Sequence, residues 1–284
     1  MSIYKPSELR PFLNQLGIFP KKGLSQNFLI DGNIIRKIIA ISEVNSEDII
    51  LEIGPGPGAL TQGLLETNAS VVAVEKDEIL AKALERFHPT YSSEQFRIFC
   101  HDILTFPLRE VITPLVKQGQ KAKVIANLPY HLTTPILTLF APLYDLFSSL
   151  TVMVQEEVGR RMTAQPNTSD YSSFTVFLRF FAEPEYAFMV SHHCFYPAPR
   201  VDSAVVLPKL RSPPLTGENM NLFFQLTRTA FEHRRKMLRS SLKDLFSAQT
   251  IEVALESIGL NPLSRPENLS LEEFLQLFSI LYPS

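Results

Sequence analysis

The sequence predicts an α/β sheet with helices on both faces, followed by a small all-helical domain. From about residue 49, short β-rich runs alternate with helical patterns, as in a parallel sheet whose strands are joined by helices. The apolar residues of these runs are nearly continuous, which is typical of strands covered on both sides. After Leu207 only helical patterns follow. We therefore expect one domain over residues 1–208 and a helical domain over 209–284.

The individual elements are predicted from periodicity and end signals. An amphipathic helix is expected over Asn33–Ile41, where isoleucines recur on one helical face. The expected strands are Ile49–Ile53, Val71–Glu75, Arg97–Cys100, Lys123–Asn127, Leu150–Gln155, Glu185–Val190 and Ser203–Leu207. A proline-rich linker is expected between Pro208 and Gly217. Ser270 and Glu273 form a capping box that begins the last helix.

The composition is that of an ordinary globular protein. The chain has 284 residues, 45% of them hydrophobic and 20% charged, with a formal net charge of −2. This balance excludes a protein that coats nucleic acid through overall charge, so any RNA contact must come from local patches. The charged N-terminus does not resemble a signal peptide, and no uncharged apolar run approaches the roughly 18–20 residues of a membrane span. We expect a cytoplasmic protein without membrane contact.

The cysteines and histidines do not predict a metal site. Two cysteines, Cys100 and Cys194, are too few for a disulfide framework. His101 and the pair His192-His193 lie next to them and would suit zinc, but adjacent residues of an extended chain point to opposite sides. Reduced, structural thiols and no metal are expected.

A glycine-rich loop joins the first strand to the following helix. Gly54, Gly56 and Gly58 alternate with two prolines and remove the Cβ atoms that would keep a ligand from the backbone. Glu75 ends the next strand and is placed to accept hydrogen bonds from both hydroxyls of a ribose. The same spacing fits a dinucleotide fingerprint, and a loop without any ligand is a further alternative.

The prolines of this loop favour S-adenosylmethionine over a dinucleotide. Pro55 and Pro57 remove backbone donors that a pyrophosphate would need, whereas S-adenosylmethionine carries no phosphate. Asp102, just past the third strand, offers a second carboxylate suited to accept from an adenine amino group. A helix-capping or turn aspartate is the alternative at that position.

The most specific motif follows the fourth strand, as Asn127-Leu128-Pro129-Tyr130. An adenine exocyclic amine is a poor nucleophile because its lone pair is delocalised into the ring. The Asn127 side-chain oxygen and a backbone carbonyl can each accept one N–H bond from it and favour a tetrahedral nitrogen. Pro129 stiffens the turn, and Tyr130 offers an aromatic face to an extruded base. A plain turn is the alternative.

These residues resemble the KsgA-type small-subunit ribosomal RNA adenine dimethyltransferases, which share ancestry with the erythromycin-resistance rRNA methylases. The resemblance covers nearly the whole chain. It is carried by Ser25–Leu29 (SQNFL), Glu52–Gly56 (EIGPG), Glu75, Asp102, Asn127–Tyr130 (NLPY) and Phe195–Val205 (FYPAPRVDSAV).

The resemblance implies a Rossmann-like class I methyltransferase fold with S-adenosyl-L-methionine as cofactor. It implies that Asn27 and Leu29 contact the cofactor together with the residues already named, and that Phe195 closes the target pocket over the base. The cofactor-binding residues are then Asn27, Leu29, Gly54, Gly56, Glu75, Asp102 and Asn127, and the catalytic ones Asn127, Leu128, Pro129, Tyr130 and Phe195. It further implies dimethylation of adjacent adenosines in small-subunit rRNA during ribosome biogenesis, on a partly assembled subunit.

Two basic clusters are candidates for RNA contact. The first comprises Lys5, Arg10, Lys21, Lys22, Arg36 and Lys37. The second lies in the helical domain and comprises Arg228, Arg234, Arg235, Lys236, Arg239 and Lys243. In an otherwise near-neutral protein they favour RNA positioning, and a solvated helix face is the alternative.

Three other functions compete with an rRNA dimethyltransferase. A DNA adenine methyltransferase would use the same chemistry but normally needs a target-recognition domain larger than about 75 helical residues. A non-catalytic assembly or transcription factor could lose the acceptors, which are present here. A nicotinamide dehydrogenase would need a hydride site, for which the sequence offers no candidate.

Overall fold

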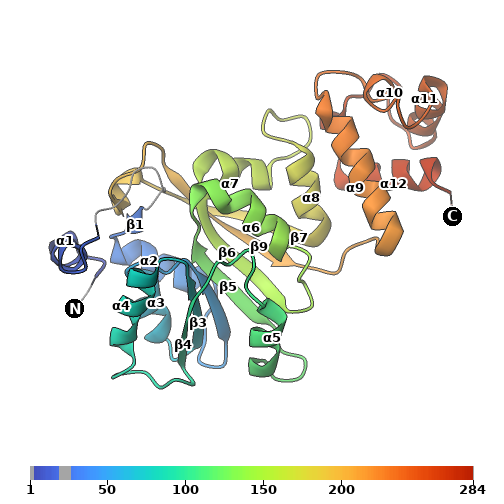
Figure 1. The fold of residues 1–284 in the computed structure, drawn as a ribbon. Helices are drawn as coiled ribbons and strands as arrows, with labels where there is room; N and C mark the ends of the chain where they lie inside the picture. Colours follow the sequence, from blue (N-terminus) through green and yellow to red (C-terminus); the bar gives the residue numbers. More distant parts are fainter. Residues whose placement is uncertain (1–2, 19–26, 284) are drawn as a thin grey trace. The chain divides into compact units, whose positions relative to one another are not determined.

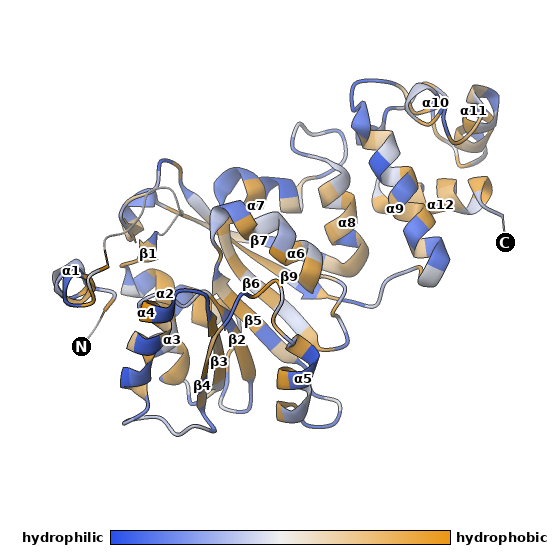
Figure 2. Cartoon of the chain, viewed as in Figure 1, coloured by the Kyte–Doolittle hydropathy of each residue, from blue (hydrophilic) through white to orange (hydrophobic). Residues whose placement is uncertain are grey.

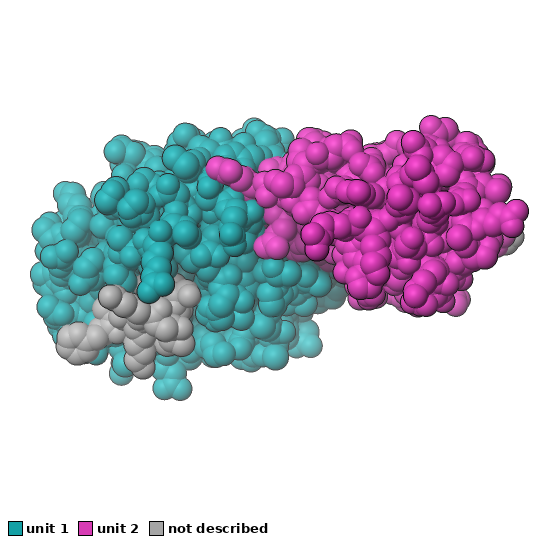
Figure 3. Space-filling view, turned by 90° about the horizontal axis from the view of Figure 1, so that it is seen from above, with its two compact units in different colours: residues 1–159, 183–211 teal, residues 160–182, 212–284 magenta. Residues whose placement is uncertain are grey.

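The structure is a computed structural model that describes residues 3–18 and 27–283. It divides into two compact units (Figure 3). The first comprises Met1–Gly159 and Glu183–Arg211, and the second comprises Arg160–Ala182 and Ser212–Ser284. The predicted boundary after residue 208 stays a prediction; the second unit resumes at Ser212 and also includes Arg160–Ala182.

The first unit is built on a seven-stranded sheet of order β4-β3-β2-β5-β6-β9-β7. The strands are β2 (Ile49–Ile53), β3 (Ser70–Glu75), β4 (Phe96–Cys100), β5 (Ala122–Asn127), β6 (Phe147–Gln155), β7 (Ala182–Val190) and β9 (Ser203–Leu210). Each of the seven predicted strands is confirmed, with ends that differ by zero to three residues. Helices cover both faces of the sheet (Figure 1).

The sheet is mixed, so the expectation of a purely parallel one was wrong. Strands β2 to β6 pair in parallel, whereas β9 runs antiparallel to β6, with Gln155 opposite Ser203. Six of the eight residues of β9, from Ser203 to Pro208, are buried. A strand covered on both sides has the same apolar run in either direction, so its sequence does not reveal its orientation.

Strand β9 also extends into the expected linker. It continues through Pro208 to Leu210, and its pairing with β6 passes over Leu207 and Pro208, of which the proline has no N–H to donate. Gly217, expected at the end of the linker, is the first residue of a helix. The linker is therefore shorter than the prolines suggested.

The helices of the first unit bury apolar side chains, most of them against the sheet, whereas those of the first helix lie in a separate cluster with Phe28 and Leu80. They are α1 (Pro6–Gln15), α2 (Gly32–Ile41), α3 (Ala59–Leu65), α4 (Glu78–Leu84), α5 (Leu108–Ile112), α6 (Thr133–Phe140) and the start of α7 (Glu156–Thr163). Helix α2 confirms the predicted helix, and Asp31 caps it by accepting from the N–H groups of Asn33 and Ile34. Ile35 and Ile38 of α2 join the core above β2 and β3.

A two-stranded ribbon lies outside the main sheet and was not predicted. Strand β1 (Phe28–Leu29) pairs antiparallel with β8 (Phe195–Tyr196). Each strand has two residues, too few for a periodic pattern. The ribbon brings the segment before α2 beside a segment more than 160 residues later.

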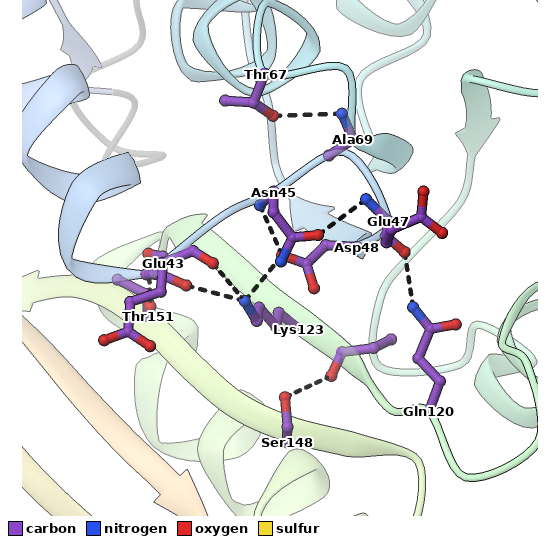
Figure 4. A network of polar contacts seen from close by, with 12 residues as sticks. Glu43, Asn45, Glu47, Asp48, Thr67, Ala69, Gln120, Lys123, Ser148 and Thr151 are labelled. Atoms are coloured by element: carbon purple, nitrogen blue, oxygen red, sulfur yellow. Dashed lines mark hydrogen bonds and ion pairs between the residues drawn. The ribbon is translucent and has the colours of Figure 1, made fainter.

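A polar network fixes the edge of the sheet where the strands begin (Figure 4). Lys123, near the start of β5, donates to the carbonyls of Ser42 and Glu43 and pairs with Asp48 at 2.8 Å. Its side chain is only 17% exposed and that of Asp48 11%, so this pair is shielded from solvent. The network ties the end of α2 to β5, at the edge opposite the carboxyl ends of the strands.

Among its described residues, the second unit is helical apart from Ala182, the first residue of β7. It contains the end of α7, α8 (Ser173–Phe181), α9 (Gly217–Glu232), α10 (Leu238–Ser241), α11 (Ala248–Ser257) and α12 (Leu271–Leu281). The capping box at α12 is confirmed, because Ser270 Oγ accepts from the Glu273 N–H and Glu273 Oε2 from the Ser270 N–H. Hydrophobic and hydrophilic residues alternate along the ribbon of α9, as expected for a helix that buries one face (Figure 2). No helix in the described part of the chain is long and apolar enough to cross a bilayer.

Helix α8 joins the second unit through aromatic packing. Phe180 stacks on Phe223 of α9 with ring centroids 5.2 Å apart, and its edge meets Phe224 at 4.8 Å. Phe223 in turn packs against Phe278 of α12. These contacts join residues that lie 43 or more positions apart, so no local pattern reveals them.

Candidate active site

A cavity of about 400 Å³ opens at the carboxyl ends of β2, β3 and β5. Its volume lies in the range of pockets that hold small molecules. The lining includes every predicted site residue except Phe195. These residues are Asn27, Leu29, Gly54, Gly56, Glu75, Asp102, Asn127, Leu128, Pro129 and Tyr130.

The glycine loop reaches the cavity in a conformation that requires glycine. Gly54 and Gly56 have φ values of +62° and +58°, in the left-handed region that residues with a side chain rarely adopt. A Cβ on Gly56 would also lie 3.1 Å from the ring of Phe28. Glycine at position 56 therefore allows both the left-handed backbone conformation and the close approach of the Phe28 ring.

Glu75 anchors this loop from the end of β3. Its Oε2 accepts from the Gly56 N–H and its Oε1 from the Asp77 N–H, both at 2.9 Å. The residue is 8% exposed, and burial raises the pKa of its carboxyl group. Each carboxylate oxygen can accept a second bond, so the group can still receive both hydroxyls of a diol.

Asp102 lies on the cavity wall next to Lys76. The Lys76 ammonium is 2.8 Å from Asp102 Oδ2 and lowers the pKa of that carboxyl group, and the Leu104 N–H donates to Oδ1. The carboxylate thus stays ionised at neutral pH. Because the Lys76 side chain is 72% exposed, the ion pair is weak and can give way to another donor.

The Asn127 side chain presents an acceptor at the end of β5. Its Nδ2 donates to the Asn27 carbonyl at 3.1 Å, which fixes the amide plane. Among the hydrogen bonds of the described residues, none uses Asn127 Oδ1 as acceptor, although the residue lines the cavity. This oxygen is therefore available to an N–H donor in the cavity.

The two residues after Asn127 fix the turn. The Leu128 N–H donates to the Met153 carbonyl of β6 at 3.0 Å. Pro129 follows with φ of −63°, the value that its ring imposes. The backbone that precedes Tyr130 is thereby attached to the sheet.

Tyr130 stands at the cavity with its hydroxyl group in a hydrogen bond. Its OH is 2.7 Å from Ser203 Oγ. Burial raises the pKa of the Tyr130 phenol, which therefore stays protonated at neutral pH. Tyr130 is part of the cavity lining.

Phe195 is not brought to this cavity. It lies in β8 opposite Leu29, is 3% exposed, and packs in the core with Leu29 and Val190. Its assignment as the residue that closes the target pocket stays a prediction. The structure places its backbone beside Leu29, which does line the cavity.

Glu52 lines the cavity but was not among the predicted site residues, although it begins the segment Glu52–Gly56 that carries the resemblance. It is 1% exposed at the end of β2, and its Oε2 lacks a hydrogen-bond partner in the described residues. Burial raises the pKa of Glu52 to about 8. A glutamate inside the otherwise apolar run Ile49–Ile53 is the signal that could have identified it.

The raised pKa of Glu52 predicts a specific pH dependence of stability. The unfolded chain loses this proton near pH 4.5, whereas the folded chain keeps it to about pH 8. The contribution of this proton to the free energy of unfolding is therefore complete below pH 4.5. It is lost as the pH rises from there through about 8. Glu52→Gln, which stays neutral, should melt several degrees higher than the parent at pH 8.5 and nearly equally at pH 5.

Thermal melts at the two pH values test this expectation. Glu47→Gln changes an exposed glutamate at the opposite edge of the sheet and should leave the difference between the two pH values unchanged. If the melting temperatures of Glu52→Gln and its parent changed equally between pH 5 and pH 8.5, a buried, protonated Glu52 would be contradicted.

Other residues singled out from the sequence either lie outside the cavity lining or fall outside the described residues. Ser25, Gln26, Lys21 and Lys22 fall outside the described residues. Cys100 is exposed, and the Cys194 thiol lies 3.6 Å from Asp31 Oδ2. No group of three or more metal-ligating side chains occurs within residues 3–18 and 27–283.

Comparison with known proteins extends these observations. The family model for ribosomal RNA adenine dimethylase matches residues 20–282. The ribosomal RNA small subunit methyltransferase A of Protochlamydia amoebophila is 63% identical over 284 residues, covering 100% of this chain and 99% of the relative. The protein of the same name from Chlamydia caviae is 47% identical and covers 99% of both chains.

Solved structures share the fold. A dimethyladenosine transferase from Plasmodium falciparum aligns with a TM-score of 0.71 at 25% identity, covering 88% of this chain and 95% of that one. The 23S rRNA methyltransferase ErmE aligns with a TM-score of 0.70 at 25% identity, covering 90% and 99%. The expected class I methyltransferase sheet with a C-terminal helical region is thus confirmed.

Proposed function

Because this chain belongs to the ribosomal RNA adenine dimethylase family, we propose that it transfers methyl groups from S-adenosylmethionine to the exocyclic amine of adenosines in small-subunit rRNA. The observation that carries this function is that Asn127 Oδ1, which accepts no hydrogen bond among the described residues, belongs to a residue that lines the same cavity as Tyr130. The proposed product is a pair of adjacent dimethyladenosines, formed on a partly assembled subunit in the cytoplasm during ribosome biogenesis.

The residues of the cavity fit S-adenosylmethionine. Glu75 retains acceptor capacity for a ribose diol, and the carboxylate of Asp102 can exchange Lys76 for an adenine amino group. Pro55 and Pro57 leave few backbone donors for a phosphate, which this molecule does not have. Asn27, Leu29, Gly54 and Gly56 complete the proposed binding surface. When bound, S-adenosylmethionine supplies an electrophilic methyl group.

The chain's own residues activate and align the amine. Asn127 Oδ1 accepts one N–H of the adenine amine, and the backbone carbonyl of the Leu128-Pro129 turn accepts the other. Two acceptors disfavour the planar amine and direct its lone pair toward the methyl group. Since the turn is tied to β6 through the Leu128 N–H, the acceptors are held before the base arrives.

Tyr130 receives the base that leaves the RNA stack. Stacking of a base on an aromatic ring is worth about 1–3 kcal/mol, which offsets part of the few kcal/mol needed to unstack it. Phe195 is proposed as the second aromatic face. In the structure it lies buried beside Leu29, so this role requires the β1–β8 ribbon to move.

Methylation of unmodified small ribosomal subunits tests the proposed function. The protein is incubated with labelled S-adenosylmethionine and the subunits, and the modified nucleotides are mapped by mass spectrometry. We expect two methyl groups on the exocyclic amine of each target adenosine. Naked rRNA and adenine-rich duplex DNA are tested in parallel as comparison substrates for the subunits. Label on DNA alone, or on no nucleic acid, would contradict the proposal.

The helical unit is proposed to position RNA through part of its basic cluster. Arg234 donates to the carbonyls of Thr168 and Ser169 and pairs with Glu267 at 2.8 Å, so it holds this unit together. Arg239 pairs with Glu252. The remaining members of the cluster are exposed and form no ion pair within the described residues: Arg228, Arg235, Lys236 and Lys243.

Charge reversal of Arg235 and Lys236 should weaken binding to the subunit and lessen its salt dependence. Each lost phosphate contact lowers the slope of log K against log salt by about 0.9 in magnitude. Binding is measured at several salt concentrations, with S-adenosylmethionine affinity as the internal control. An unchanged salt slope would identify the cluster as a solvated face.

A further inference from the structure

The hydroxyl of Ser203 lies against the residue proposed to receive the target base. Ser203 begins β9, is 0% exposed, and its Oγ is 2.7 Å from the hydroxyl of Tyr130, 73 residues earlier in the chain. Tyr130 lines the cavity, whereas Ser203 does not. We infer that Ser203 is a positioning residue that fixes the Tyr130 ring in the orientation that stacks on the target adenine. This inference rests on the proposed function.

Ser203 is held by the sheet on one side and by a turn on the other. It stands opposite Gln155 in the pairing of β6 with β9, and the preceding carbonyl of Asp202 accepts from the Glu156 N–H at 3.0 Å. The Asp202 carboxylate accepts from the backbone N–H of His192 at 2.9 Å and is 2.7 Å from its Nδ1. The Ser203 hydroxyl therefore starts from a well-fixed backbone.

Tyr130 needs such a partner because its own segment is short. It begins a single 3-10 turn, Tyr130–Leu132, and its ring borders an open cavity. The backbone is attached to β6 through Leu128, but that bond does not restrain rotation about the side-chain torsions. A hydrogen bond at the far end of the ring restrains both torsions, so the stacking face is oriented before the base enters.

The bond uses the part of Tyr130 that stacking does not use. The base contacts the ring face, while the hydroxyl points to Ser203 and is shielded with it. Removal of either hydroxyl should therefore leave the face intact but less well oriented. We expect a modest loss of kcat/KM for the subunit, much smaller than the loss caused by Tyr130→Ala.

Six variants test this inference. They are Ser203→Ala, Tyr130→Phe, their combination, Ser203→Thr, Tyr130→Ala, and Ser42→Ala as the matched control. Ser42 Oγ donates to Thr151 Oγ1 at 2.9 Å, and both residues are buried in the same unit without lining the cavity. For each variant, kcat and KM for unmodified subunits are measured at saturating S-adenosylmethionine. Cofactor affinity and the thermal midpoint are measured alongside.

We expect Ser203→Ala and Tyr130→Phe each to lower kcat/KM for the subunit about fivefold, the worth of one hydrogen bond. The double variant should be no worse than either single variant, because both remove the same bond. Cofactor affinity should stay unchanged throughout. Ser42→Ala should lose a similar amount of thermal stability and keep full activity, whereas Ser203→Thr, which retains a hydroxyl, should restore activity.

Two results would overturn the role of Ser203: full activity of Ser203→Ala, or defects that multiply in the double variant. If Ser203→Ala does not fold, Tyr130→Phe is the deciding variant. Wild-type activity of Tyr130→Phe would also exclude a role for the hydrogen bond between Tyr130 and Ser203. Tyr130→Ala separates this inference from the proposed function. Its full activity would remove Tyr130 from the site, whereas its inactivity beside an active Ser203→Ala would overturn the positioning role only.

Discussion

Asn127→Ala is expected to lower kcat by one to two orders of magnitude at saturating cofactor. The lost contact is a hydrogen bond to an amine that gains positive charge as it attacks, and bonds of this kind are worth about 1.5–3 kcal/mol. Because the acceptor acts mainly in the transition state, the KM for the subunit should change little. The Asn127 side chain also holds the Asn27 carbonyl, so cofactor affinity should fall as well.

Measurement at saturating S-adenosylmethionine separates the two effects of this substitution. Asn45→Ala is the matched control, since Asn45 Oδ1 accepts from the Glu47 N–H at the opposite edge of the sheet (Figure 4). It removes the same side chain without touching the cavity and should keep wild-type kcat. A kcat for Asn127→Ala within twofold of wild type would exclude Asn127 Oδ1 as an essential acceptor.

Most of the sheet could be predicted because strands such as β2, β3 and β9 are buried on both faces. The run Ile49–Ile53 is recognisable without any knowledge of its neighbours, and its ends are those of the observed strand. The orientation of β9 and the assignment of α8 to the second unit depend instead on contacts between distant residues. The two-residue strands β1 and β8 carry no periodic signal at all.

The cavity was predictable for a related reason. Glu75, Asp102 and Asn127 each follow or end a parallel strand, and such ends meet at one edge of the sheet. The partners of these residues were not predictable, because they depend on side-chain conformation. The bond from Tyr130 to Ser203 joins residues 73 positions apart.

The basic cluster illustrates the same limit at the surface. Its charges are plain in the sequence, but sequence alone does not separate structural from exposed members. Arg234 lies in the middle of the run, yet its guanidinium is committed to Glu267 and two carbonyls. Arg235, the next residue, is exposed. Only the fold separates the two roles.

Glu75→Ala is expected to weaken S-adenosylmethionine binding about a hundredfold. Each hydrogen bond to a charged group is worth about 1.5–3 kcal/mol, and the substitution removes acceptors for both ribose hydroxyls. It also leaves the N–H groups of Gly56 and Asp77 without their carboxylate, which loosens the glycine loop. Both consequences act on cofactor affinity rather than on the methyl-transfer step.

Calorimetry measures the S-adenosylmethionine affinity of three variants, Glu75→Ala, Glu75→Gln and Glu47→Ala, for which we expect different losses. Glu75→Gln keeps one acceptor oxygen and should lose about tenfold in affinity, between the parent and Glu75→Ala. Glu47→Ala removes an exposed glutamate that pairs with Lys117 far from the cavity and should bind the cofactor normally. Thermal melts establish that each variant is folded before its affinity is compared. Unchanged affinity in folded Glu75→Ala would remove this carboxylate from the cofactor site, and equal losses in Glu75→Gln and Glu75→Ala would show that the negative charge, rather than the number of acceptors, holds the ribose.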